Sequence, residues 1–340
     1  MVRISFLVAT FAAFLITAVS GYVVIPWLRK LKYGQTINEI GPTWHQSKQG
    51  TPTMGGLMFV LGILAGVICG YSLLLTSEKT FMDQMYRTQN MSLLITMLTA
   101  MAFGAIGFVD DYIKVVKKRN LGLTEKQKLI LQFFVTAAFL VAQYLIGHIN
   151  TNVNIPIIGH IELGILYYPI VFAGIIFMVN AVNLTDGIDG LCSSVTFVVA
   201  LTFFIISVSY GYYSNSIFAC ALAGALGGFL VWNFYPAKVF MGDTGSMFLG
   251  GSVVAMAWAI NRPEILVLVG IIYTCEALSV VVQMTYFKLT HGKRIFKMSP
   301  IHHHYEMSGW SEKKIDAVFT AVSTVGCALG VLLMYITLNK

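Results

Sequence analysis

Ten long apolar stretches divide this 340-residue sequence, and they constrain its fold more than any other feature. A helix needs about 20 apolar residues to cross a bilayer, and each stretch is close to that length. Only 11% of the residues are charged, against about 25% in soluble domains. The sequence therefore predicts an all-α integral membrane protein with about ten transmembrane helices. The predicted spans are 4–26, 54–75, 91–109, 128–147, 163–182, 192–210, 216–232, 245–260, 264–287 and 315–336.

The first stretch is longer than the apolar core of a signal peptide and runs into basic residues at 29–32, so we expect an uncleaved first span. The rest of the sequence shows no internal repeat, low-complexity tract or soluble domain. We therefore predict a single polytopic membrane domain over 1–340. Its catalytic loops are expected at 27–53, 110–127, 183–191, 233–244 and 288–314.

Lys and Arg are distributed unevenly between the predicted loops. Seventeen of the 22 fall in loops that follow odd-numbered spans, and the other five are Arg3, Lys79, Arg87, Arg262 and Lys340. Because basic residues are enriched in cytoplasmic loops, we expect these odd-numbered loops in the cytoplasm and both termini on the outer side. The net charge of +7 then reflects membrane topology, and no nucleic-acid partner is expected.

Acidic residues gather at the predicted cytoplasmic helix ends. The apolar run FGAIGFVDDYIK, residues 103–114, ends in Asp110 and Asp111, and charge near a bilayer is costly and usually functional. Adjacent helical residues point about 100° apart, so the two carboxylates cannot both face one atom. Lys114 is three and four residues further on, where it can form an ion pair. A solvated helix end is the alternative interpretation.

The segment NAVNLTDGIDGL, residues 180–191, carries polar side chains at a spacing of three. On a continuous helix they would share one face. Gly187 and Gly190 instead favour an interrupted helix with exposed N–H groups, which can bind a base edge or a phosphate. A polar loop between spans is the alternative. The spaced residues are Asn180, Asn183, Asp186 and Asp189.

A third segment, residues 233–251, places Asp243 between Gly242 and Gly245 just before a predicted span. This carboxylate has few basic neighbours in the sequence, and it suits a hard divalent cation that prefers oxygen ligands. Phe240 can stack on a planar base. An ordinary helix N-cap is the alternative role for Asp243.

Two further segments carry charge at the same predicted face. In GPTWHQSKQGTPTMGG, residues 41–56, Gly and Pro prevent a plain helix and Lys48 adds a positive charge. In KMSPIHHHYEMSGW, residues 297–310, three consecutive histidines cannot easily ligate one metal, but they can contact phosphate or sugar hydroxyls. Glu276 lies deep within the ninth span, and the sequence assigns it no role.

Together these residues favour phosphoryl transfer at the lipid boundary, where a soluble nucleotide substrate can meet a membrane-embedded acceptor. A transporter is an alternative, but transporters place their charges near the bilayer midplane. A structural scaffold would leave the clustered carboxylates unexplained.

The motifs GTPTMGG, DDYIK, NAVNLTDGIDGL, FMGDTGS and PIHHHYE resemble, in this order, those of the bacterial phospho-N-acetylmuramoyl-pentapeptide-transferase family. The resemblance covers nearly the whole chain. It implies Mg²⁺-dependent transfer of phospho-MurNAc-pentapeptide from UDP-MurNAc-pentapeptide to undecaprenyl phosphate, giving lipid I and UMP. It also implies a multi-pass protein of the bacterial cytoplasmic membrane, a homodimer, and an active-site cleft facing the cytoplasm.

The resemblance also implies roles for residues at matching positions. Asp243 matches the Mg²⁺ ligand, and Asp110 and Asp111 match an essential acidic pair in which Asp110 is the base or the group that activates the acceptor. A sibling enzyme that uses UDP-GlcNAc is the nearest alternative, and the triple-histidine motif argues against it. The nucleotide and phosphate positions are Lys114, Lys126, Asn183, Asp186, Gly187, Asp189, Asn233 and Phe240, and the substrate loop carries His302, His303 and His304.

Overall fold

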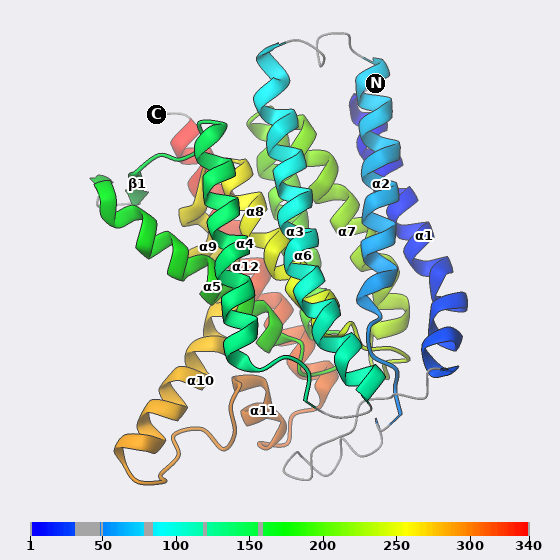
Figure 1. The fold of residues 1–340 in the computed structure, drawn as a ribbon, viewed down its shortest axis with the longest axis vertical. Coiled ribbons are helices and arrows are strands. Elements are labelled where there is room, and N and C mark those ends of the chain that lie inside the picture. Colours follow the sequence, from blue (N-terminus) through cyan, green and yellow to red (C-terminus); the bar gives the residue numbers. More distant parts are fainter. Residues whose placement is uncertain are drawn as a thin grey trace.

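The computed structural model describes residues 2–30, 48, 50–77, 84–117, 121–155 and 159–338. The predicted catalytic loops 27–53 and 110–127 therefore lie partly outside the described residues, at 31–47, 49 and 118–120. The chain forms a bundle of long helices with one small β-hairpin (Figure 1). Both ends of the described chain lie at the upper end of the bundle in this view, on opposite sides of it (Figure 1).

The elements follow one another in the order α1 (Val2–Lys30), α2 (Gly56–Ser77), α3 (Gln84–Lys117), α4 (Glu125–Leu145), β1 (Asn152–Ile155), β2 (Gly159–Glu162), η3 (Gly164–Leu166), α5 (Tyr167–Thr185), α6 (Leu191–Ser209), α7 (Tyr213–Asn233), α8 (Gly242–Ala259), η4 (Pro263–Ile265), α9 (Leu266–Val269), α10 (Ile271–Leu289), α11 (Ile301–Glu306) and α12 (Glu312–Leu338). The two strands pair antiparallel, with Asn152 opposite Glu162. Thr124 caps α4 in a capping box with Gln127, as expected for this helix start.

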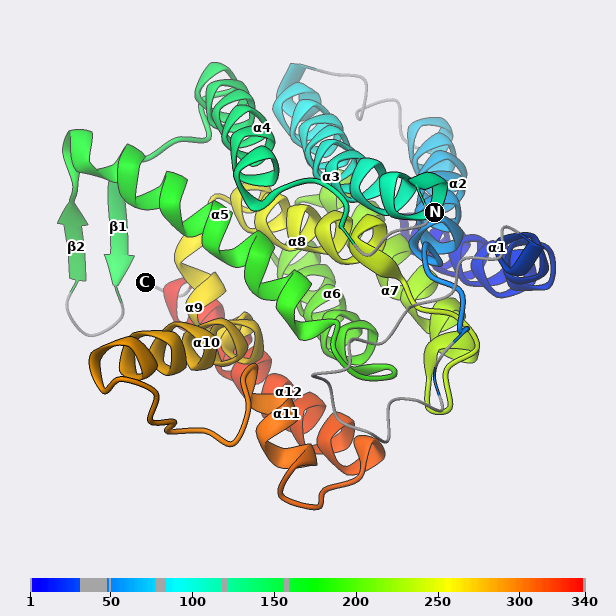
Figure 2. The same ribbon diagram turned by 60° about the horizontal axis from the view of Figure 1, so that its bottom comes forward.

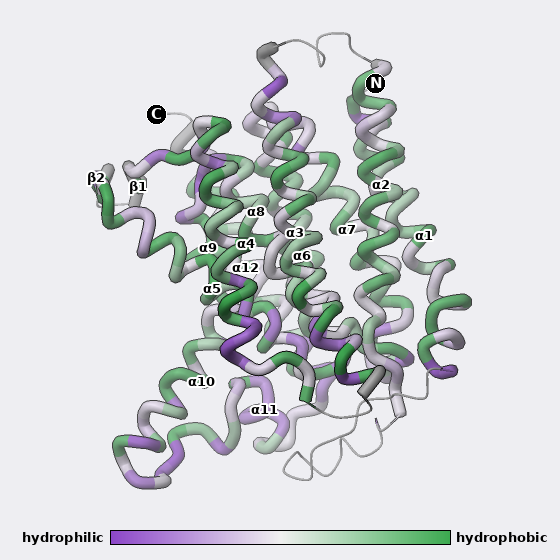
Figure 3. The backbone as a smooth tube through the Cα atoms, in the orientation of Figure 1, coloured by the Kyte–Doolittle hydropathy of each residue, from purple (hydrophilic) through white to green (hydrophobic). Residues whose placement is uncertain are grey.

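Eight helices of the described chain are long and apolar enough to cross a membrane, or nine when a bent pair counts as one span. The bent pair consists of Pro263–Val269 and Ile271–Leu289, which meet at 79°. This finding confirms a multi-pass membrane protein, with a number of candidate spans close to the expected ten. Figure 3 shows apolar residues along the helices and hydrophilic residues gathered near the lower end, around the start of α4 and at α11.

The predicted span 245–260 is not among these candidate spans. It corresponds to α8, a helix rich in Gly and Ser whose residues from Thr244 to Ala259 are all buried. Helices α3, α5 and α2 pack around it. A helix enclosed by protein on every side does not need the apolar surface that lipid contact requires, which explains its weaker hydropathy.

Small residues allow α1 and α2 to pack closely. Gly62, Gly66 and Gly70 on α2 repeat every four residues and face α1, so a Cβ added to Gly66 would overlap the carbonyl oxygen of Ala9 and the side chain of Ala13. Lipid gives no hydrophobic driving force for association between helices, so close backbone packing of this kind is a main source of stability.

We predict that Gly66→Ala destabilises the protein by about 1–3 kcal/mol, because the added methyl group has no space between α1 and α2. Thermal unfolding in detergent measures the change. Gly174→Ala on α5 is the control, because a Cβ there meets no atom within 4 Å and alanine favours helix. Equal melting temperatures for the two variants would contradict the prediction.

Candidate active site

Three carboxylates from two helices meet at the lower end of the bundle. Asp110 and Asp111 lie in the last turns of α3, and Asp243 lies in the first turn of α8. One carboxylate oxygen from each residue lies within 4.8 Å of the others. Because the pair belongs to one helix and Asp243 to another, the cluster depends on the packing of α3 against α8.

Asp111 joins α3 to the N-terminus of α8. Its Oδ2 accepts hydrogen bonds from the Thr244 N–H at 2.9 Å and the Thr244 hydroxyl at 2.6 Å, and its Oδ1 accepts from the Asp243 N–H at 3.3 Å. The first N–H groups of a helix lack intrahelical partners and favour negative charge. Asp111 thus caps α8 from another helix and fixes the position of Asp243.

Asp110 points in a different direction, toward two lysines. Its Oδ2 lies 2.5 Å from Lys114 Nζ, and its Oδ1 lies 3.2 Å from Lys128 Nζ and accepts a hydrogen bond from the Leu123 N–H at 2.8 Å. The side chain is fully buried. Asp110 thus binds mainly the two lysines and Asp111 mainly the start of α8, although Lys114 Nζ also lies 3.9 Å from Asp111 Oδ1 and is shared by both.

Asp243 shares both lysines with Asp110. Its Oδ2 lies 2.6 Å from Lys128 Nζ and 3.3 Å from Lys114 Nζ, and Asn183 Nδ2 donates to its Oδ1 at 3.0 Å. Burial disfavours the charged form, but Lys114 and then Lys128 outweigh it and hold the pKa of Asp243 well below its usual range. Its side chain is 20% exposed, against 1% for Asp110, so Asp243 is the more accessible ligand.

The basic partners of Asp243 are distant in sequence, so the local sequence gave no sign of them. Lys114 comes from α3, and Lys128 comes from α4. Lys126 has an exposed side chain and no recorded contact with the carboxylates, whereas Lys128, two residues later, joins two of them. Lys128 is not among the site residues predicted from the sequence. It lies one turn into an N-capped helix, on a different face from Lys126, and this position could have indicated its role.

The helix predicted to break in segment 180–191 does so at the expected place. α5 ends at Thr185 and α6 begins at Leu191, with Gly190 at a φ of 81° between them. Asn180 points away from the cluster and exchanges hydrogen bonds with Gln132 of α4. Burial, together with the negative charges of Asp243 and Asp111, raises the pKa of Asp186 to about 8.

The cluster therefore holds more carboxylates than ammonium groups. The three carboxylates of Asp110, Asp111 and Asp243 share only Lys114 and Lys128. Such an excess of oxygen ligands suits a hard divalent cation. The cluster Asp110–Asp111–Asp243 is thus a group that can hold a metal ion.

A second charged group lies on the other side of the 186–190 turn. Lys48 Nζ lies 2.7 Å from Asp189 Oδ1 and 2.5 Å from Glu312 Oε2, and Asp189 Oδ2 accepts from the Ala237 N–H at 2.8 Å. Burial lowers the pKa of Lys48, but hydrogen bonds to Asp189 and Glu312 outweigh burial and raise it overall. Glu312, at the start of α12, was not anticipated from the sequence.

Residues 233–240 connect this group to segment 50–56. The buried Asn233 accepts from Ser193 and donates to the Val239 carbonyl, so it fastens the end of α7 to α6 and to its own loop. The Phe240 N–H donates to the Pro52 carbonyl, and the Phe240 carbonyl accepts from the Gly55 N–H. The Phe240 ring is only partly buried.

The three consecutive histidines of α11 have three different partners. His302 Nδ1 lies 2.9 Å from Glu276 Oε2, and His303 Nδ1 lies 2.6 Å from Glu306 Oε2. His304 Nδ1 accepts from the Lys297 N–H at 3.1 Å. The His302 and His303 ring centroids lie 4.1 Å apart, but their Nδ1 atoms face different carboxylates.

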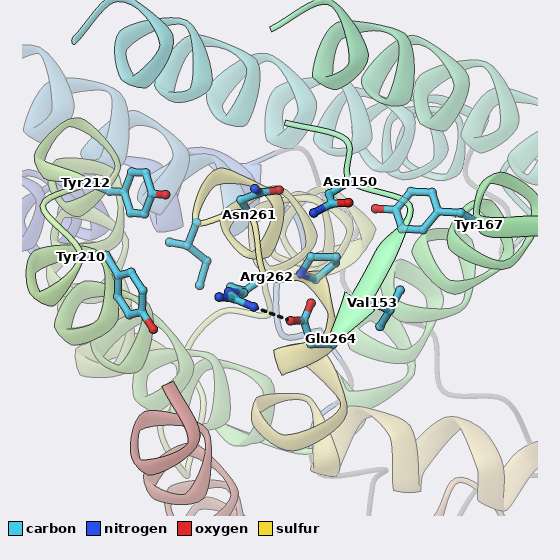
Figure 4. Close-up of a pocket in the computed structure, with 10 residues that line it drawn as sticks. Asn150, Val153, Tyr167, Tyr210, Tyr212, Asn261, Arg262 and Glu264 are labelled. Atoms are coloured by element: carbon cyan, nitrogen blue, oxygen red, sulfur yellow. Dashed lines mark hydrogen bonds and ion pairs between the residues drawn. The ribbon is translucent and has the colours of Figure 1, made fainter. Parts of the chain in front are cut away.

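A separate cavity of roughly 260 Å³ lies at the opposite end of the bundle, and Figure 4 shows its lining. Tyr167, Tyr210 and Tyr212 surround it, and Arg262 pairs with Glu264 at 3.5 Å. No predicted site residue lines this cavity, so it is distinct from the carboxylate cluster.

Known protein families match the part of the chain that carries the carboxylate cluster. The family model described as "Glycosyl transferase family 4" matches residues 93–261, which include all three clustered carboxylates. The fold and the site thus define a multi-pass membrane transferase. A second model, "Phospho-N-acetylmuramoyl-pentapeptide-transferase signature 1", matches residues 48–60. The chain belongs to the phospho-N-acetylmuramoyl-pentapeptide-transferase family.

Relatives that bear this name align with nearly the whole chain. The protein of Halalkalibacterium halodurans is 45% identical over 325 residues, covering 95% of each chain. That of Clostridium perfringens strain 13 is 46% identical over 331 residues, covering 96% of this chain and 98% of its own. That of Caldicellulosiruptor bescii is 43% identical and covers 97% of both. The family model and these relatives support the muramoyl branch over a UDP-GlcNAc-using sibling.

We predict that Lys128→Met lowers transferase activity by at least about a hundredfold, since it removes the charge shared by Asp110 and Asp243 from a site built for electrostatic stabilisation. The matched control is Lys126→Met on the same helix, which should retain activity within about threefold. Release of the nucleotide product measures both. A larger loss at Lys126 than at Lys128 would contradict this assignment and favour the sequence-based one.

Proposed function

We propose that this protein transfers phospho-MurNAc-pentapeptide from UDP-MurNAc-pentapeptide to undecaprenyl phosphate, producing lipid I and UMP. The observation that carries the proposal is the cluster of Asp110, Asp111 and Asp243 with two shared lysines, in a chain about 45% identical to transferases with that name. The cluster lies at one end of an apolar bundle, where a water-soluble donor and a lipid acceptor can meet.

The proposal includes Mg²⁺ as the cation, with Asp243 as its principal ligand. Asp243 is the most accessible carboxylate of the cluster, and Asp111 is occupied by the N–H groups of α8. When bound there, Mg²⁺ would supply positive charge against the donor diphosphate. Lys114 and Lys128 supply the remaining positive charge from this chain's own residues.

The 186–190 turn is proposed to bind the nucleotide end of the donor. It carries Asp186, Gly187 and Asp189 between the carboxylate cluster and the Lys48–Glu312 pair. Asn233 and Phe240 extend the same region, and the partly exposed ring of Phe240 is suited to stack on a uracil. The substrate loop with His302, His303 and His304 adjoins this turn, because His302 lies against Gly187.

For the chemical step, we propose direct attack by an oxygen of the lipid phosphate on the phosphorus that bears the sugar. The bond between this phosphorus and the bridging oxygen breaks, and UMP leaves with that oxygen. A phosphate monoester is already largely ionised at neutral pH, so little deprotonation is needed. Asp110, buried between two lysines, is placed to orient the acceptor through them rather than to act as a free nucleophile.

We further propose that the active site faces the cytoplasm and that both termini lie outside the bacterial cytoplasmic membrane. The ends of the described chain share the end of the bundle opposite the carboxylates (Figure 1), and 17 of the 22 basic residues lie in loops of the catalytic side. A homodimer and a single polytopic domain over 1–340, with the catalytic loops given above, complete the proposal.

We predict that Asp243→Asn and Asp110→Asn each reduce Mg²⁺-dependent UMP release by about three orders of magnitude or more, because each removes a charge from the reacting centre. Both variants should keep a near-native melting temperature in detergent. Glu264→Gln, a carboxylate change at the opposite end of the bundle, is the control and should retain activity. Near-normal turnover of the Asp243 variant would remove the metal assignment.

The direct route predicts that no aspartyl-phosphate accumulates during turnover. Rapid acid quench of the enzyme with donor labelled on the sugar-linked phosphate tests this, with and without polyprenyl phosphate. We expect no protein-bound label on the timescale of UMP release. A labelled aspartate that forms and decays as fast as turnover would establish a two-step covalent mechanism instead.

A further inference from the structure

Glu276 and His302 form a buried pair that the proposed reaction leaves without a role. Glu276 belongs to α10 and His302 to α11, 26 residues later, and both side chains are almost completely inaccessible. Figure 2 shows α10 and α11 close to one another, beside α12. A buried carboxylate is costly unless it is paired, and Glu276 is paired on one oxygen only: its Oε1 has no hydrogen-bond partner among the described residues.

The pair fixes which nitrogen of His302 carries a proton. An ionised carboxylate can only accept hydrogen bonds, so the Nδ1 that lies 2.9 Å from Glu276 Oε2 is the donor. A second hydrogen-bonded group commonly sets the tautomer and ring orientation of a histidine in this way. Nε2 is then the free end of the ring, and it is buried with no partner in the part of the chain that the structure describes.

The free end of the ring points at the nucleotide-binding turn. A Cβ added to Gly187 would overlap the His302 ring, and Nε2 is the atom it would meet first. Gly187 therefore has no side chain because the imidazole occupies that space. Asp186 and Asp189 flank this contact in the same turn, so the orientation of the ring bears directly on where both carboxylates stand.

We infer that Glu276 is a positioning residue: it holds the His302 imidazole against Gly187 and thereby sets the geometry of the 186–190 turn for the UDP-linked donor. The inference deepens the proposed function and rests on it. Glu276 reaches the substrate only through His302, and it acts on binding of the donor rather than of the lipid. Glu276, in the interior of the bent span, is thus a residue that determines specificity for the UDP-linked donor.

The experiment compares Glu276→Ala and Glu276→Gln in the full-length protein by UMP release, with each substrate varied in turn. Removing the partner that orients a functional histidine typically costs about 10–100-fold. We expect Glu276→Ala to raise KM for the UDP-linked donor about tenfold or more, with KM for polyprenyl phosphate within about twofold. Glutamine keeps a carbonyl oxygen that can accept from Nδ1, so Glu276→Gln should recover most of the loss.

A double-mutant cycle with His302→Ala tests whether Glu276 acts through the histidine. If it does, Glu276→Ala has little further effect on kcat/KM once His302 is absent. Glu264→Ala, in the same bent span but at the far end, is the matched control and should change neither KM. Melting temperatures in detergent accompany every variant, because loss of stability alone would not single out the donor KM.

Three results would each overturn the inference: an equal change in both KM values without recovery by glutamine, full additivity of Glu276→Ala with His302→Ala, and normal donor kinetics in Glu276→Ala. These results are distinguishable from failure of the proposed function, since in that case the unsubstituted protein itself would release no UMP from the donor and polyprenyl phosphate. Normal donor kinetics in Glu276→Ala, with Asp243→Asn inactive, would leave the function standing and remove the positioning role.

Discussion

The hydrogen bonds between Asp111 and the first turn of α8 are the interaction on which the active site depends. They use one carboxylate to satisfy N–H groups of a buried helix start, and in doing so they bring Asp243 to Asp110. Together with the packing of α3 against α8, this contact sets Asp243 of one helix beside Asp110 and Asp111 of the other. Asp111, which the sequence indicates as one of two catalytic carboxylates, therefore also holds the site together.

The two lysines complete the arrangement because each serves more than one carboxylate. Lys114 and Lys128 both lie near Asp110 and Asp243, so changing either carboxylate alters the field at the other. Strong coupling of this kind is expected where charges are shared in a partly dry site. It also means that the effects of single substitutions here will not add.

The sequence was sufficient to predict the helical membrane class, the capped start of α4, the break after Thr185 and the local ion pair of Lys114 with the two adjacent aspartates. These features depend on local geometry: apolar length, capping residues, glycine, and the angle between helical neighbours. Family resemblance added Asp243 as a metal ligand, which remains a prediction, although the structure brings Asp243 to the acidic pair.

The misses concern contacts between distant parts of the chain. Glu312 and the partner of Glu276 could not be found from local sequence, because the groups they contact come from helices far along the chain. Lys128 was indicated only by its place on the capped helix α4, and its two carboxylate partners lie on other helices. The four-residue spacing of Gly62, Gly66 and Gly70 was readable and would have predicted a close helix contact, but not which helix it faces. The predicted span at α8 is not among the candidate spans, and its weak hydropathy reflects its enclosure by protein.

That enclosure has a consequence for how the protein is made. A helix with little affinity for lipid gains nothing from entering the bilayer alone, so α8 gains its place from the helices that surround it. Asp243 lies in the first turn of this helix. The acidic centre is therefore complete only after α8 has packed against its neighbouring helices. Assembly of the bundle is in this way a condition for activity.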